Sequence, residues 1–285
     1  MSWWGQLWSL ETVTVLVLAL AAVVYARGWA RLRRRMPHRF RGLQLLAFLA
    51  GLDALLVAVA SPLEARAAES LAAHMTQHVI LMMVSPPLLW LGAPMAPILR
   101  GLPEVAMRMA IGVLAWAPVR RGGRVITHPA VGLLSFTVVA WAWHVPALYE
   151  VALRSHAWHH VEHICFLTTA LLFWWPVVQP WPSRPRWPRW TMIPYLLLAE
   201  VQNTLLAAVF TFVGRAMYPT YAATAARTGA SALDDQVAAG LIMWGGGSLA
   251  LLLPAAWVAL ELLAPARSRQ SARPAHPRPI PPPAL

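Results

Sequence analysis

Histidine is the residue type in this chain best suited to binding a metal ion or a haem. The chain has ten histidines, and imidazole is the commonest metal ligand in proteins. His74 and His78 are four residues apart, so they would share one face of a helix. His160 and His163 would share a face of another helix, and His159 would also pair with His163. Helix bundles build metal and haem sites from side chains on facing helices, so this spacing predicts such a site.

Methionines accompany the first histidine pair. Met75 follows His74 directly, and Met82 continues the helical stripe of His74 and His78. Imidazole together with thioether suits copper or iron and does not suit hard cations such as magnesium or calcium. A further histidine, His144, ends another apolar segment. The predicted metal ligands are His74, His78, His144, His160, His163, Met75 and Met82, with copper as the expected ion.

Other interpretations of these residues stay open. A single histidine at a membrane surface is usually an amphipathic anchor, and a single methionine usually contributes packing. A haem-binding site is the chemical alternative, because a haem takes one axial histidine from each of two facing helices, which His78 and His163 could supply. The chain would then be a cytochrome subunit of a redox enzyme. Cys165 lies two residues from His163, points off its face and is expected to pack.

Composition places these residues in a membrane protein. Of the 285 residues, 59% are hydrophobic and 12% are charged, whereas soluble domains carry about a quarter charged residues. Apolar segments long enough to cross a bilayer occur seven times, which predicts an all-α, polytopic transmembrane helix bundle. A segment at 102–118 contains Glu104 and Arg108 and is predicted to be an interfacial helix. The predicted spans are 10–27, 42–60, 72–92, 129–146, 160–178, 191–213 and 237–261.

Arginines predict the orientation of the bundle. Most of the 23 basic residues fall in alternate loops on one side, which the positive-inside rule makes cytoplasmic. The N-terminus is then outside and the C-terminus cytoplasmic, with residues 1–263 as the transmembrane domain. Residues 264–285 are rich in Pro and Arg and are predicted to be a disordered cytoplasmic tail. The net charge of +12 is thus explained by topology and by anionic lipid, not by nucleic acid.

Polar residues deep in two predicted spans form a second candidate site. Asp53 lies near the middle of 42–60, and Glu200 and Asn203 lie near the middle of 191–213. Charged groups at that depth are costly and are expected to face the bundle interior with a partner. They predict either an intramembrane path for protons or ions, or a structural hydrogen-bonded pair between these two spans.

Several motifs resemble those of the CtaG family of cytochrome c oxidase assembly factors, in its polytopic membrane form. The likeness covers roughly residues 15–260. It is carried by His74-Met-Thr-Gln-His78, by Trp141-Ala-Trp-His144-Val-Pro, by His159-His-Val-Glu-His163 and by Asp235-Gln236 followed by Ala239-Gly240.

This resemblance implies a multi-pass protein of the bacterial plasma membrane that is needed to form active haem–copper oxidase. It implies a role in copper-centre formation on the outer side, with oxidase subunits or other assembly factors as partners and no catalytic activity of its own. The haem-binding cytochrome subunit is one alternative. The other is a copper transporter in which Asp53 and Glu200 extend the path inward.

Overall fold

Long apolar helices make up most of the computed structural model, which describes residues 10–264. That part of the chain contains helices and turns but no strand. Five of its helices are long and apolar enough to cross a membrane. They are α2 (Leu10–Arg35), α3 (Gly42–Val59), α12 (His156–Val178), α13 (Met192–Phe212) and α15 (Ala232–Leu263).

Two further candidate spans are bent. In one, the helical run Leu71–Leu91 turns by 69° into α7 (Met95–Gly101), and in the other α9 (Ala117–Ile126) turns by 63° into α10 (Pro129–His144). If each bent pair is one span, the described residues contain up to seven spans. The prediction of an all-α, polytopic bundle is therefore confirmed.

The run Leu71–Leu91 consists of α5 (Leu71–Val79), a π-helical segment (Ile80–Val84) and α6 (Ser85–Leu91). Its irregularity follows from Pro86 and Pro87, which have no N–H to donate to the carbonyls four residues earlier. The carbonyl of Met82 instead accepts a 2.8 Å hydrogen bond from the indole N–H of Trp174 on α12. A π-turn and a neighbouring side chain thus satisfy backbone groups that the prolines leave free.

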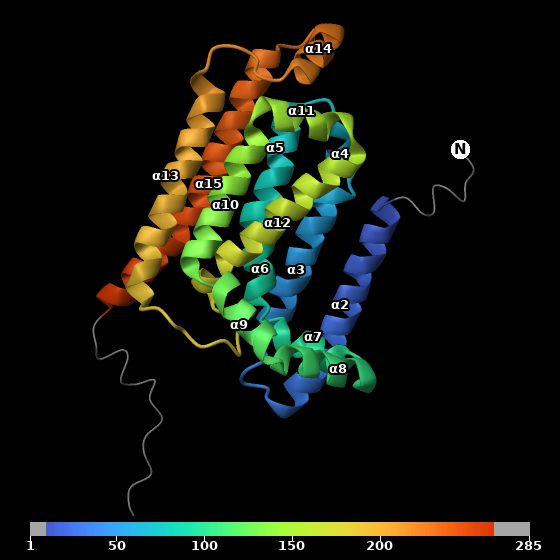
Figure 1. The fold of residues 1–285 in the computed structure, drawn as a ribbon, viewed down its shortest axis with the longest axis vertical. Coiled ribbons are helices and arrows are strands. Elements are labelled where there is room, and N and C mark those ends of the chain that lie inside the picture. The colour runs from blue at the N-terminus through green and yellow to red at the C-terminus, as the bar shows by residue number, and fades with distance from the viewer. Residues whose placement is uncertain (1–9, 265–285) are drawn as a thin grey trace, which may run out of the picture.

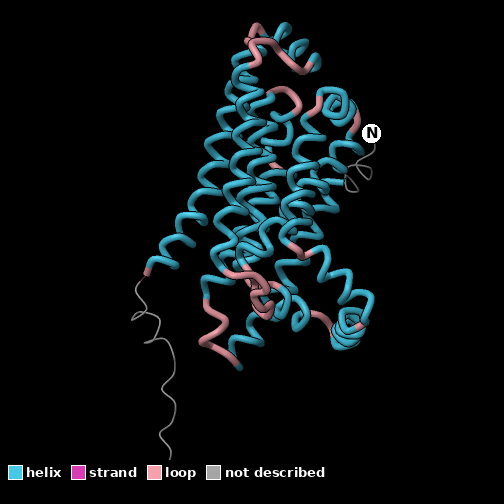
Figure 2. Tube along the Cα trace, turned by 60° about the vertical axis from the view of Figure 1, so that its left-hand side comes forward, coloured by secondary structure: helices cyan, strands magenta, loops and turns pink. Residues whose placement is uncertain are grey.

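Short helices close both ends of the bundle. Figure 1 shows α4 (Pro62–Ala67), α11 (Pro146–Arg154) and α14 (Pro219–Thr228) at the upper end, and α7, α8 (Glu104–Ala115) and α9 at the lower end. Figure 2 shows the same division from a second direction. The described chain begins at the upper end with α2 and finishes at the lower end with α15, as Figure 1 shows.

The helix predicted at 102–118 differs from the observed one. α8 ends at Ala115, Trp116 is extended, and a second helix, α9, begins at Ala117. Pro118 has no N–H to donate to the carbonyl four residues earlier and is tolerated in the first turn of a helix, so one continuous helix is interrupted here. No residue of α8 or α9 is buried against the rest of the described chain. Apart from Ala264, the predicted tail at 264–285 lies outside the described residues.

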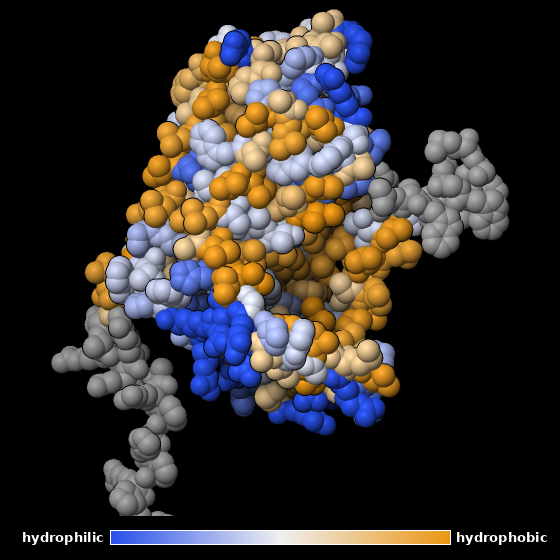
Figure 3. Space-filling model, viewed as in Figure 1, coloured by the Kyte–Doolittle hydropathy of each residue, from blue (hydrophilic) through white to orange (hydrophobic). Residues whose placement is uncertain are grey.

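Charge separates the two ends of the molecule. Figure 3 shows hydrophobic residues over the middle of the visible face and strongly hydrophilic residues gathered most densely at the lower end. α2 extends to Arg35, eight residues past the predicted end of the first span, and finishes with three consecutive arginines. Long arginine side chains at the end of a span can reach the lipid headgroups while their stems stay in apolar surroundings.

The crossing of α2 and α7 depends on two glycines. A Cβ atom added at Gly28 would collide with the carbonyl oxygen of Pro97, and one added at Gly101 would collide with the carbonyl oxygen of Val24. The backbones of these helices therefore touch directly, as small residues allow in membrane bundles.

We expect Gly28→Ala to lower the free energy of unfolding by about 1–3 kcal/mol, because the added methyl group forces α2 away from α7. Thermal unfolding of the purified protein in detergent measures the change. Gly112→Ala is the control, since nothing lies within 4 Å of a Cβ at that position on α8. Equal melting temperatures for the two variants would contradict the direct backbone contact.

Candidate metal centre

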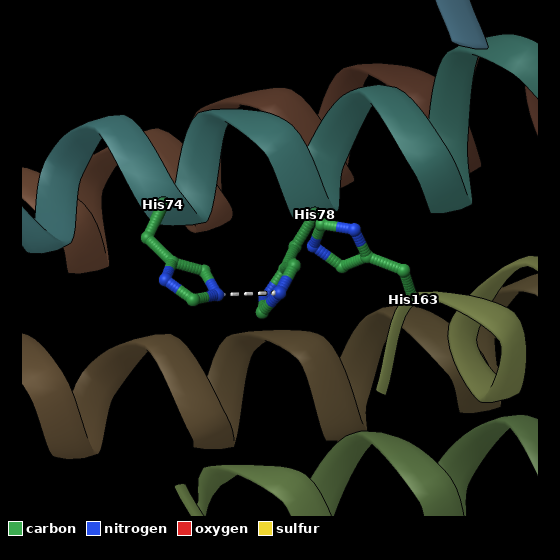
Figure 4. Close-up of side chains that lie close together, drawn as sticks. All are labelled: His74, His78 and His163. Atoms are coloured by element: carbon green, nitrogen blue, oxygen red, sulfur yellow. Dashed lines mark hydrogen bonds between the residues drawn. The ribbon is translucent and has the colours of Figure 1, made fainter. Parts of the chain in front are cut away.

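Four of the five predicted histidine ligands lie together near the upper end of the bundle. His74 and His78 come from α5, His163 from α12 and His144 from the last residue of α10, and all four are buried. The Nε2 atoms of His74 and His78 are 3.0 Å apart. The His78 ring centroid is 5.8 Å from that of His163 and 5.9 Å from that of His144. Figure 4 shows the rings of His74, His78 and His163 converging between α5 and α12.

The fifth predicted histidine, His160, is not part of this convergence. Its ring contacts that of His159 at 6.4 Å, whereas the His159 ring lies 4.2 Å from His163 and 5.1 Å from His74. α12 begins at His156 and is helical throughout, so residues four apart share a face and His159 aligns with His163. The sequence indicated this pair as well, but only the packing of α12 decides which histidine faces α5.

Glu162 is the main member of the site that sequence reasoning missed. Its side chain is completely buried. One carboxylate oxygen lies 3.8 Å from Nε2 of His74 and the other 3.6 Å from Nε2 of His78. Neither oxygen has a hydrogen-bond partner among the described residues. The signal was present in the sequence, because a carboxylate within a membrane span is a candidate functional residue by default.

Hydrogen bonds fix the tautomer of His74. The hydroxyl of Tyr221 donates to the carbonyl of Ala67 at 2.7 Å and lies 2.9 Å from Nδ1 of His74. Since that hydroxyl proton is already used, Nδ1 of His74 must donate to the tyrosine oxygen. The lone pair of a neutral His74 is therefore on Nε2, directed at His78. This arrangement is typical of metal-binding histidines, whose second nitrogen is held by a polar partner.

The same reasoning extends to His78. Because Nε2 of His74 carries a lone pair, Nε2 of His78 must supply the proton of their 3.0 Å contact. The lone pair of a neutral His78 is then on Nδ1, a buried atom with no hydrogen-bond partner among the described residues. Nε2 of His163 is buried and unpartnered in the same way.

His144 lies next to Met75. Its Nδ1 lies 2.6 Å from the carbonyl oxygen of Ala140, so Nδ1 carries the proton. Its Nε2 lies 3.4 Å from the sulfur of Met75. Met75 and Met82 are both buried, and Met82 lines a small cavity together with His78 and His144.

An open cavity leads to the cluster from the upper end of the bundle. It has a volume of about 550 Å³, and Glu64, His74 and His159 are among its lining residues. Nδ1 of His159 is 3.3 Å from a carboxylate oxygen of Glu64, and the amide of Gln77 donates to the other oxygen at 2.5 Å. Burial raises the pKa of Glu64, but the hydrogen bond and charge of His159 outweigh it and leave this pKa lowered. Glu64 therefore adds a carboxylate at the mouth of the site.

The start of α5 is held in place by another span. The carboxylate of Asp235 on α15 accepts hydrogen bonds from the Ser70 hydroxyl at 2.7 Å and from the backbone N–H of Leu71 at 2.6 Å. A carboxylate at a helix N-terminus satisfies free N–H groups and interacts favourably with the helix dipole. Asp235 thereby positions the turn of α5 that carries His74.

The predicted polar path is brought near the histidine cluster only in part, because Asn203 lines the small cavity that His78 and His144 also line, whereas Asp53 and Glu200 do not line it. Asp53 is exposed on α3. Glu200 accepts hydrogen bonds from Thr204 on its own helix and from Ser248 on α15 at 2.5 Å. Asn203 donates to the carbonyl of Met243, also on α15, at 3.4 Å. The hydrogen bonds of Glu200 and Asn203 therefore join α13 to α15 and do not join α13 to α3.

The arrangement is suited to holding a transition-metal ion. One ligand atom from each of His74, His78 and His163 can be chosen so that all three lie within 4.8 Å of one another. Ligand nitrogens about 2.0–2.1 Å from a tetrahedral ion lie about 3.3 Å apart, so modest side-chain rotations would close the set. The carboxylate of Glu162 would offset part of the charge of the ion.

Fold and site together indicate a multi-pass helical membrane protein with a buried cluster of histidines that could hold a metal ion. The model of the family described as cytochrome c oxidase caa3 assembly factor, Caa3_CtaG, matches residues 23–264. The chain belongs to this family, and its resemblance to it is confirmed.

Curated relatives are mycobacterial. Uncharacterized protein Mb0105 of Mycobacterium bovis is 30% identical over 64% of this chain. Uncharacterized protein ML1998 of Mycobacterium leprae is 28% identical over 66% of this chain. In both cases the match spans 28% of the relative, so the chain corresponds to less than a third of their length. No solved structure matches the chain.

We expect Tyr221→Phe to weaken binding of Zn²⁺ to this site by roughly 10- to 100-fold, because His74 loses the partner that fixes its tautomer. Competition against a chelator in detergent solution measures the affinity. Tyr195→Phe is the matched control, since this buried tyrosine donates to the carbonyl of Phe173 instead. Equal affinities for the two variants would show that Tyr221 does not position a ligand.

Proposed function

We propose that this protein binds copper transiently at the histidine cluster and so supports formation of a copper centre in a haem–copper cytochrome c oxidase. The observation that carries the proposal is the convergence of His74, His78 and His163 around the buried carboxylate of Glu162. Copper is the cargo in this account, and no reaction is catalysed. Oxidase subunits or other assembly factors in the bacterial plasma membrane would receive it.

Ligand chemistry favours copper over other ions. Among divalent first-row metals, copper binds most tightly to sites made of nitrogen, oxygen and sulfur ligands, and thioether ligands select soft ions. The sulfur of Met75 lies 3.4 Å from the nearest imidazole nitrogen, so imidazole and thioether are adjacent in the cluster. Hard cations prefer sites made of oxygen ligands.

Access favours exchange of the ion at the outer surface. The 550 Å³ cavity reaches His74 and His159 from the end of the bundle opposite the one where strongly hydrophilic residues gather most densely and where α2 finishes with three arginines. The positive-inside rule makes the arginine-rich end cytoplasmic. Copper would thus enter and leave on the extracytoplasmic side, where Glu64 attracts the cation to the mouth of the cavity.

The packing around the histidines argues against the haem alternative. The His78 ring lies 4.4 Å from the Phe166 ring and 5.8 Å from the His163 ring. A macrocycle between His78 and His163 would need both helices to separate. A single ion requires only side-chain rotation.

The transporter alternative loses its expected inward path. Asp53 is exposed, and Glu200 is hydrogen-bonded to Thr204 and Ser248. Neither Asp53 nor Glu200 lines the two cavities beside the histidine cluster, which supports binding at the cluster over transport through it.

We expect the His74→Ala/His78→Ala double variant to retain less than a tenth of the copper that the wild-type protein retains after purification and dialysis. Metal analysis of matched protein amounts measures this. His38→Ala is the control, because this exposed histidine lies at the opposite end of the bundle. Equal copper in the wild type and the double variant would contradict the proposal, whereas a haem absorption band lost in the double variant would favour the cytochrome alternative.

A further inference from the structure

We propose that the cluster contains a separate inner subsite, formed by His144, Met75 and Met82, that binds a monovalent soft cation such as Cu⁺. The outer subsite, formed by His74, His78, His163 and Glu162, would bind Cu²⁺. This inference rests on the proposed function, which requires only that copper binds somewhere in the cluster. It adds a second position and a selectivity for oxidation state.

The contact between His144 and Met75 is the first observation. Nδ1 of His144 lies 2.6 Å from the Ala140 carbonyl, which can only accept a hydrogen bond, so the proton is on Nδ1. Nε2 of a neutral His144 then carries a lone pair, and it lies 3.4 Å from the Met75 sulfur, which also carries lone pairs. Two electron-pair donors that face each other in a buried site form the geometry of a shared cation, not of a strong hydrogen bond.

The distance itself fits a shared ion. Bonds of about 2.0 Å to nitrogen and about 2.3 Å to sulfur at a tetrahedral angle place the two ligand atoms about 3.5 Å apart. The observed 3.4 Å separation of Nε2 and Sδ is within a few tenths of that value. No rearrangement of the helices is needed to bring these two ligands to one ion.

A small cavity beside His144 and Met82 supplies the space. Its volume is about 30 Å³, and it is lined by His78, Met82 and His144 among others. A cavity of this size holds about one water molecule, and hence one small ion. Met82 therefore borders the same space as His144 and is placed to supply a second thioether.

Charge distinguishes the inner subsite from the outer one. Glu162 and Glu64 lie at the outer subsite and its mouth. No Asp or Glu within residues 10–264 lines the inner cavity. The cost of burying an ion rises with the square of its charge, so a site of neutral ligands in an apolar bundle favours a monovalent cation. Thioether ligands favour the same choice because they select Cu⁺.

His78 lies between the two subsites. Its Nε2 is 3.6 Å from Glu162, and its ring centroid is 5.9 Å from that of His144. Its Nδ1 has no hydrogen-bond partner among the described residues, so a turn of the ring toward the inner subsite breaks only the hydrogen bond between its Nε2 and that of His74. An ion that reaches the inner subsite from the outer cavity would pass this side chain.

Silver(I) and Cu²⁺ separate the two subsites experimentally, since Ag⁺ is soft, monovalent and not redox-active under the assay conditions. We expect Met75→Leu in the full-length protein in detergent to weaken Ag⁺ binding at least tenfold and to leave Cu²⁺ binding within twofold of wild type. We expect Glu162→Gln to have the opposite effect. Met192→Leu is the matched control, because Met192 is equally buried but lies on α13 away from the cluster.

The outcomes separate this inference from the proposed function. If Met75→Leu leaves Ag⁺ affinity unchanged, or lowers Ag⁺ and Cu²⁺ affinity equally, the inner subsite is overturned. The proposed function still stands in that case if the wild type binds copper. Wild-type protein that binds Ag⁺ through Met75 but no copper would overturn the proposed function and keep the subsite. If Met75→Leu misfolds, X-ray absorption spectroscopy of the silver-loaded wild type is the deciding measurement. The subsite requires sulfur ligands to silver, so a spectrum without them would overturn it.

Discussion

A buried carboxylate constrains this structure more than any single packing contact does. An ionised side chain inside an apolar bundle is stable only with an opposite charge or several hydrogen-bond donors nearby. Glu162 has neither within hydrogen-bonding distance among the described residues, yet the nitrogens of His74 and His78 lie 3.8 and 3.6 Å from its oxygens. α5 and α12 thus bring two imidazole nitrogens close to a carboxylate that has no hydrogen-bond partner among the described residues.

Hydrogen bonds from other helices hold the helical run that carries His74 and His78. Asp235 on α15 holds the first turn of α5, and Tyr221 on α14 sets the tautomer of His74. The π-turn caused by the prolines of the third span lets Trp174 on α12 bond to the backbone of the helix that carries the histidines. Hydrogen bonds from α12, α14 and α15 thus fix one irregular helix. Rigid second partners of this kind keep metal ligands oriented before the ion arrives.

Sequence periodicity was sufficient for the helices and for most of the histidines. Spacing of four residues placed His74 beside His78, and membrane-length apolar runs predicted the bundle. Periodicity does not decide which side chain faces a neighbouring helix, because that depends on how one helix is rotated against another. His159 rather than His160 faces α5, and Asp53 faces outward rather than toward Glu200. Contacts such as that between Nε2 of His144 and the sulfur of Met75 join residues 69 apart, so no local pattern encodes them.

If this cluster holds copper for the oxidase, as proposed above, the metal content of the oxidase itself reports on it most directly. A strain whose only copy of the gene carries Glu162→Gln would be used to purify its haem–copper oxidase. The copper and haem contents would then be compared with those from the wild type. The account predicts oxidase with normal haem and less than half of the normal copper. Full copper in oxidase from the variant strain, with the variant protein present in the membrane, would contradict it.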